Sequence, residues 1–225
     1  MTGLEFMFRW GHFLAGVCWI GVLWYFNFIQ GSYFAEADGA AKSDATQKLV
    51  PRALWWFRWG AMGTFLSGVV ILAMKGHMAG PAIFSTSWGV TILVGALMGT
   101  FMWFNVWFII WPAQKIVIAN AVAVAGGGEA NPAAAVAAGK AGLASRTNTL
   151  FSLPLLFFMG AASHLPVSIG NDGIGCALGA AAALVVVVEA NGLFGKMGPM
   201  KSVSGVIHMG ILLTVVLFGL VEGLS

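Results

Sequence analysis

Six apolar segments, each near the length of a membrane-spanning helix, follow one another along the chain. A bilayer core of about 30 Å needs about 20 apolar residues in a helix. The segments cover Phe6–Gln30, Ala53–Met74, Gly89–Trp111, Thr147–His164, Gly173–Ala190 and Gly205–Leu224. Because 59% of the 225 residues are hydrophobic and only 8% are charged, the chain cannot build a water-soluble surface around them. The sequence therefore predicts an all-α integral membrane protein, a bundle of about six transmembrane helices.

The basic residues indicate how these helices are oriented. The connections after the first, third and fifth segments carry Lys42, Lys48, Arg52, Lys115, Lys140, Arg146, Lys196 and Lys201. The opposite side has only Arg9 and Lys75 near the segment ends. Because basic residues collect in cytoplasmic loops, we expect a multi-pass protein of the inner (plasma) membrane with both termini periplasmic or exterior. The same topology accounts for the net charge of +3 without nucleic acid as a partner.

Other features limit the classes of site. Cys18 and Cys176 lie in apolar segments, and the absence of CxxC and CxxCH argues against a disulfide framework, a zinc ribbon and covalent c-type haem. The Ala/Gly-rich stretch 121–145 predicts a cytoplasmic loop with a weak helix. "GALMG" (95–99), with Gly60, Gly63 and Gly68, predicts close packing between helices. None of these features indicates a soluble catalytic domain.

The candidate site rests on histidines. His12 is expected about 9 Å along the first helix from its exterior end, and His164 closes the fourth helix on the same side, so the two can meet at similar depth. His77 follows the second segment on that side, and His208 enters the sixth from the cytoplasmic side. An ionisable residue inside a membrane helix is costly and therefore points to function. Neutral imidazole is a good axial ligand for haem iron.

The residues around the two histidines suit a flat cofactor. Gly16 lies one turn from His12 and Gly160 one turn from His164, so each histidine has a patch without a side chain beside it. Arg9, one turn the other way from His12, is a candidate partner for haem propionates or an interfacial arginine that snorkels to the surface. The pattern alone leaves haem ligation, structural hydrogen bonding, copper binding and a proton relay open.

Four segments, taken in order, carry a family resemblance. They are "RWGHFLAGVCWIGVLWYFNFI" (9–29), "WWFRWGAMGTFLSGVVIL" (55–72), "VGALMGTFMWFNVWFIIWPAQKIV" (94–117) and "SRTNTLFSLPLLFFMGAASHLP" (145–166). Together they resemble the N-terminal membrane domain of bacterial cytochrome c-linked urate oxidase (urate hydroxylase). Three family histidines are replaced by Trp55, Leu93 and Thr147, whereas His12 and His164 are retained. The family's C-terminal cytochrome c domain, with its CxxCH motif, has no counterpart in this sequence.

The resemblance implies a division of the chain and a function. Residues 1–166 are expected to form a four-helix, haem-bearing membrane unit, and residues 167–225 two additional transmembrane helices. The implied function is that of a b-type haem electron-transfer subunit, with His12 and His164 as axial ligands and His77 as an alternative ligand. It would pass electrons between a quinol or partner oxidoreductase and a separate periplasmic cytochrome c. As an enzyme it would be at most the redox membrane subunit of an oxidoreductase complex.

Two other functions remain open at this point. The first is a non-catalytic accessory or scaffold subunit of a larger membrane respiratory or oxygenase complex. The second is a transporter or channel, for which Glu189 and His208 are the candidate residues of a polar pathway. We expect these two residues to pair locally or to face lipid headgroups.

Overall fold

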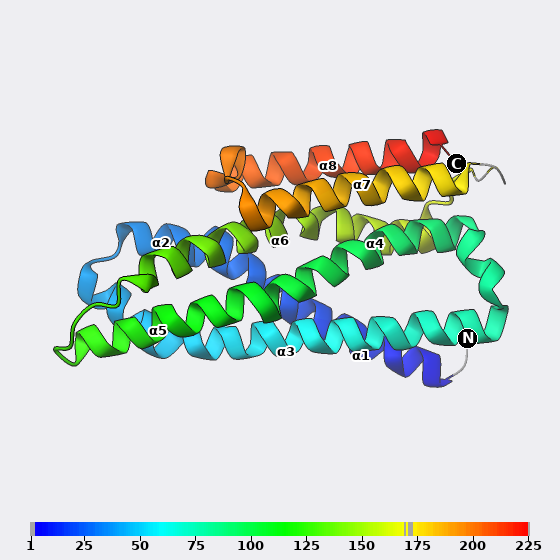
Figure 1. Cartoon of the computed structure of the whole chain (residues 1–225). Helices are drawn as coiled ribbons and strands as arrows, with labels where there is room; N and C mark the ends of the chain where they lie inside the picture. Colours follow the sequence, from blue (N-terminus) through cyan, green and yellow to red (C-terminus); the bar gives the residue numbers. More distant parts are fainter. Residues whose placement is uncertain (1–2, 169, 171–172, 225) are drawn as a thin grey trace.

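The computed structural model describes residues 3–168, 170 and 173–224. Within these residues all regular structure is helical, which confirms the all-α prediction. The helices run roughly along one direction and form an elongated bundle, and both ends of the chain lie at the same end of it (Figure 1). Cys18 and Cys176 are free thiols.

The described helices follow one another with short connections. They are α1 (Gly3–Trp24), η1 (Tyr25–Gln30), α2 (Gly31–Glu36), α3 (Gly39–Ala79), η2 (Pro81–Ser85), α4 (Ser87–Phe104), η3 (Asn105–Ile110), α5 (Trp111–Ala125), α6 (Ala133–His164), α7 (Ile174–Phe194), η4 (Gly198–Lys201) and α8 (Val203–Leu224). The η1 and η3 elements are π-helical turns that join α1 to α2 and α4 to α5 without a break. Such π-helical turns inside α-helices are frequent at functional sites.

Several stretches are apolar and long enough to cross a membrane, as expected for a multi-pass membrane protein. Among the described residues there are five: Gly3–Glu36, Gly39–Ala79, Ser87–Ala125, Ile174–Phe194 and Val203–Leu224. The α6 helix is not one of them, because its centre is polar. Its residues Thr147, Asn148, Thr149 and Ser152 are buried against other helices. The expected count of about six transmembrane helices remains a prediction.

The stretch expected as a loop is mostly helical. The α5 helix continues to Ala125 and α6 begins at Ala133, so only residues 126–132 connect them. Alanine has the highest intrinsic helix propensity, which outweighs the low complexity of this stretch. Gly127 adopts φ 82°, a left-handed conformation that favours glycine and follows many helix C-termini. Low complexity therefore predicted too long a loop here.

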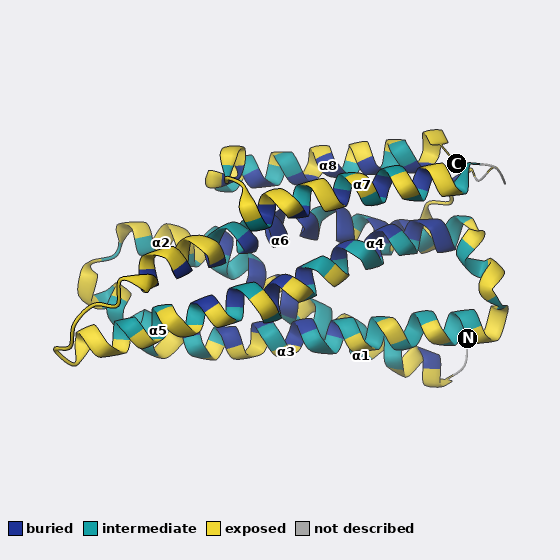
Figure 2. Ribbon diagram, in the orientation of Figure 1, coloured by how far each residue is buried: buried dark blue, intermediate teal, exposed yellow. Residues whose placement is uncertain are grey.

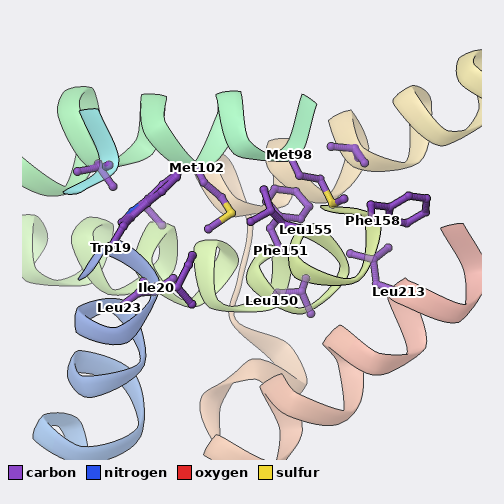
Figure 3. Close-up of a cluster of buried hydrophobic side chains, with 14 of the residues drawn as sticks. Trp19, Ile20, Leu23, Met98, Met102, Leu150, Phe151, Leu155, Phe158 and Leu213 are labelled. Carbon is purple, nitrogen blue, oxygen red and sulfur yellow. The ribbon is translucent and has the colours of Figure 1, made fainter. Parts of the chain in front are cut away.

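The α6 helix forms the centre of the bundle. It packs against α4, α5, α7 and α8, while α1 packs mainly against α3. Buried residues lie where helices face one another, and exposed residues cover the outer faces (Figure 2). In the core, the buried cluster extends from Trp19 of α1, past Met98 of α4 and Phe151 of α6, to Leu213 of α8 (Figure 3). Residues far apart in the sequence therefore share one apolar interior.

Glycines permit two close helix contacts. A Cβ on Gly95 would lie 2.8 Å from Met159 Cε, and one on Gly99 would lie 3.2 Å from Leu155 Cδ1, so α4 and α6 approach closely at "GALMG". A Cβ on Gly60 would lie 3.0 Å from the backbone nitrogen of Trp19, where α3 meets α1. The predicted close packing through small residues is confirmed.

Candidate functional site

An apolar cavity of about 480 Å³ lies between four helices. Its wall includes His12 and Gly16 from α1, Phe65 from α3, Trp88 from α4 and Leu155 from α6. A concave apolar pocket with a few polar groups is the usual form of a cofactor or ligand site. The α1–α3 pair therefore supplies the cavity with an imidazole, that of His12, as well as with apolar lining residues.

The tautomer of His12 follows from its hydrogen bonds. His12 is half-buried, and its Nδ1 lies 3.0 Å from Ser67 Oγ on α3. The hydroxyl of Ser67 donates its single proton back to the helix, to the carbonyl oxygen of Gly63 at 2.5 Å. Ser67 Oγ must therefore accept from His12, so we infer that Nδ1 carries the proton. The Nε2 atom then keeps a lone pair, which is the form that ligates metals.

A bare stretch of helix backbone lies against the imidazole of His12. A Cβ on Gly68 would lie 3.2 Å from His12 Cε1, so a larger residue there would displace the ring. The sequence prediction placed this patch at Gly16, which does line the cavity but has only Thr64 near it, at 3.9 Å. Ser67 and Gly68 were missed. Their signal is the adjacent Ser–Gly pair in "FLSGVV", but the sequence does not show that this face of α3 meets His12.

Arg9 lines the same cavity and belongs to an ion-pair cluster. Its Nε lies 3.1 Å from Glu5 Oε1, and Nζ of Lys75 on α3 lies 3.1 Å from the same oxygen. The side chain of Glu5 is fully buried, whereas Arg9 is 33% exposed. The cluster joins the first turns of α1 to the end of α3. Glu5 was not among the predicted site residues.

The structure does not bring the two predicted ligands into one cavity lining. His164 is the last residue of α6 and is exposed, and Gly160 is exposed with open space beside it. The α6 wall of the cavity is instead formed by Leu155, Leu156, Met159 and Ser163. Successive residues on a helix are rotated by about 100°, so His164 follows Ser163 onto a different face.

The remaining candidates lie apart from the cavity. His77 is exposed in the last turn of α3 and is not part of the lining. In the described part of the chain, no three or more His, Cys, Asp or Glu residues are grouped to hold a metal. A haem does not need such a group, because the porphyrin supplies four ligands and the protein only the axial ones.

The expectation is wrong for Glu189, whereas for His208 a position that faces lipid headgroups stays a prediction. Glu189 is only 3% exposed and accepts a hydrogen bond from Asn105 Nδ2 at 3.1 Å, so it does not face headgroups. His208 is exposed. The reason is that buried Val206 and Gly210 form the inward face of this part of α8, and His208 falls on the other face.

A polar seam crosses the interior along α6. Ser145 accepts from Asn27 Nδ2 at 2.8 Å, Ser152 accepts from Trp24 Nε1 at 2.9 Å, and Asn148 accepts from Asn105 Nδ2 at 2.9 Å. In a hydropathy profile these polar residues only lower the local average, and the profile does not show which helices they contact. The seam was therefore not predicted.

Comparison with known proteins identifies a family. The family model described as "Urate oxidase N-terminal" matches residues 78–218, more than half of the chain. The match contains His164 and Gly160 and crosses residue 166, whereas Arg9, His12 and Gly16 precede it. Searches of curated proteins and of solved structures returned no match. The predicted resemblance is confirmed: the chain belongs to the urate oxidase N-terminal family.

Proposed function

We propose that this protein is a membrane-embedded electron-transfer subunit that holds a b-type haem in the cavity between α1, α3, α4 and α6. Family membership associates the chain with urate oxidation. The observation that carries the proposal is His12, whose Nδ1–H is held by Ser67 so that Nε2 is left with a lone pair beside an apolar cavity. These residues fit the first axial ligand of a haem.

Several residues in or beside the cavity have a part in this function. Ser67 holds the imidazole ring of His12 in one tautomer, and Gly68 leaves room for the ring against α3. Gly16 leaves space for the edge of a flat group, and Arg9 is the candidate partner of the propionates. The apolar wall excludes water. When bound, the haem supplies one-electron transfer, and its surroundings tune the potential.

The second axial ligand has two candidates. His164, the predicted ligand, would have to turn inward from its exposed position next to Ser163. Met159 already lines the cavity from the same helix, and His–Met ligation is known for cytochromes. The two ligand sets differ in their optical spectra, so the question has a direct test.

The electron path follows from the proposed orientation. In the inner membrane with both termini periplasmic, a quinol or a partner oxidoreductase would reduce the haem and a separate cytochrome c would take the electron on the periplasmic side. The position of both chain ends at one end of the bundle supports placing them on one side of the membrane (Figure 1), and the basic loops favour the periplasmic side. His12 lies in the first half of α1, which begins at Gly3 at that end of the bundle.

A second candidate function is that of an accessory subunit without a haem. It is favoured by the exposed position of His164 and by the ion pair that already holds Arg9. In this role His12 and Ser67 would only join α1 to α3.

Optical spectra of the detergent-purified protein, made in cells supplied with haem, test the proposal. We expect a b-type spectrum, confirmed as pyridine haemochrome, that is lost in His12→Ala and retained in the control His208→Ala. A change in ligation in His164→Ala identifies His164 as the second ligand, and the same change in Met159→Leu identifies Met159. Reduction of the haem by urate in membranes tests the association with urate. A folded, colourless wild-type protein would overturn haem binding and leave the accessory role.

A further inference from the structure

Glu189 on α7 is a buried carboxyl group that the haem proposal does not use. Its side chain is 3% exposed, and its Oε2 accepts from Asn105 Nδ2 at 3.1 Å. Asn105 is fully buried and begins the π-helical turn η3. A carboxyl group thus lies inside a bundle that is apolar enough for a membrane, where an unpaired charge is expensive.

The hydrogen bonds among Asn105, Asn148 and Glu189 show which of their oxygen atoms have no hydrogen-bond partner. Asn148 Nδ2 donates to the carbonyl oxygen of Met102 at 2.9 Å, so Asn148 Oδ1 is directed to Asn105. The Asn105 amide nitrogen then donates to both Asn148 and Glu189, which uses both of its protons. Two buried oxygens, Asn105 Oδ1 and Glu189 Oε1, have no hydrogen-bond partner within the described residues.

The surrounding helices do not supply a compensating charge. The α4, α6 and α8 helices pack against α7. The charged or titratable residues on these neighbours are Lys140, Arg146 and His164 on α6 and His208 and Glu222 on α8, and α4 has none. In residues 3–168, 170 and 173–224, no basic side chain forms an ion pair with Glu189. His208 and Glu222 are exposed and Arg146 is half-buried.

We propose that Glu189 is a proton-binding site, at which the side chain is a neutral carboxylic acid that donates its proton from Oε1 to Asn105 Oδ1. This single proton supplies the donor that both unpartnered oxygens lack. Between them, the acid and the amide then each donate one hydrogen bond and accept one, and the second amide proton of Asn105 goes to Asn148, so no side-chain polar atom of the pair remains unsatisfied. The site is independent of the haem cavity, and its failure would leave the haem proposal unaffected.

The bound proton also helps to join α7 to the core. Asn105 belongs to the α4–η3–α5 helix and Asn148 to α6, while Glu189 is the one residue of α7 in this network. Loss of the proton would leave a buried charge on Glu189 next to Asn105 Oδ1, an acceptor oxygen that repels it. We therefore expect exchange of this proton with solvent to require α7 to separate locally from Asn105.

Infrared spectroscopy of the purified full-length protein tests this site, because a protonated carboxylic acid has a carbonyl band that a carboxylate lacks. At neutral pH we expect such a band, shifted in D₂O, lost in Glu189→Gln and kept in Glu222→Gln, which changes an exposed glutamate. Asn105→Leu should shift the band, because it removes the acceptor. Absence of an acid band from the wild-type protein at neutral pH would overturn the proposal without any variant. A carboxylate band at Glu189 that responds to sodium instead would overturn it in favour of a cation site.

Discussion

Two glutamates at different places in this bundle have side chains shielded from solvent, yet their surroundings differ. Glu5, between α1 and α3, is 0% exposed and pairs through Oε1 with Arg9 at 3.0 Å and Lys75 at 3.1 Å. Glu189, between α7 and the α4–α6 core, is 3% exposed and accepts from the amide of Asn105. Two cations stabilise a carboxylate at Glu5, whereas a neutral amide suits a carboxylic acid at Glu189. Low solvent exposure alone therefore does not define the charge of a buried glutamate, and its partners matter as well.

The largest effect is expected from Glu5→Gln. The substitution removes the carboxylate from both cations, and breaking a buried ion pair destabilises strongly. We expect a loss of about 3 kcal/mol in the free energy of unfolding. This is the low end of the range for breaking a buried ion pair, because Arg9 and Lys75 are partly exposed. Thermal unfolding in detergent, followed by circular dichroism, measures this loss. The control Asp44→Asn, in the exposed pair with Lys48, should lose less than about 0.5 kcal/mol. Equal losses in both variants would contradict the assignment of Glu5 as a charged anchor.

Asn105→Leu should have the next largest effect. It leaves Asn148 Oδ1 and Glu189 Oε2 without their donor, which costs about 2 kcal/mol for buried polar groups. The same unfolding measurement applies. The double variant Asn105→Leu/Glu189→Leu should recover part of the loss, because it replaces both partners with apolar groups. Strictly additive losses would show that the two side chains are not coupled.

Ser67→Ala tests the α1–α3 contact, where Ser67 holds His12 at the proposed haem site. The variant removes the acceptor of His12 Nδ1–H, and loss of such a supporting partner lowers metal-site affinity by about 10- to 100-fold. We expect haem titration to show that decrease together with a stability loss of about 1 kcal/mol. Ser163→Ala is the matched control, because Ser163 lines the cavity without contacting His12 through a hydrogen bond. Unchanged haem affinity in Ser67→Ala would remove Ser67 from the proposal.

Glu189→Gln should have the smallest effect and sharpens the comparison most. A glutamine amide donates to Asn105 Oδ1 and accepts from Asn105 Nδ2, as the neutral acid does, so the expected loss is below about 0.5 kcal/mol. The same change of Glu to Gln therefore separates the two sites by more than about 2 kcal/mol. A loss as large as that of Glu5→Gln would indicate that Glu189 is ionised and that the comparison is wrong.

The structure places only some of the predicted site residues at the cavity, for a physical reason. His12, Gly16 and Arg9 are one turn apart on one helix, and the structure keeps them together at the cavity because helix geometry is local. His164 was paired with His12 by depth alone, which does not define the face of α6 on which it lies. The structure presents Met159 and Ser163 to the cavity instead. Depth follows from counting residues, whereas rotation about the helix axis depends on packing.

The sequence by itself determined that the chain is helical and apolar, that helices pack closely at "GALMG", and the family. These properties depend on residues near one another in the chain, which hydropathy and spacing record. Only the tertiary structure decided that Ser67 holds His12, that Arg9 shares Glu5 with Lys75, and that Asn105 joins Asn148 to Glu189. Each of these interactions joins different helices, and its partners are chosen by which faces meet when the helices pack. Inside a membrane bundle every buried polar group needs such a partner, so the pairing appears only in the packed structure.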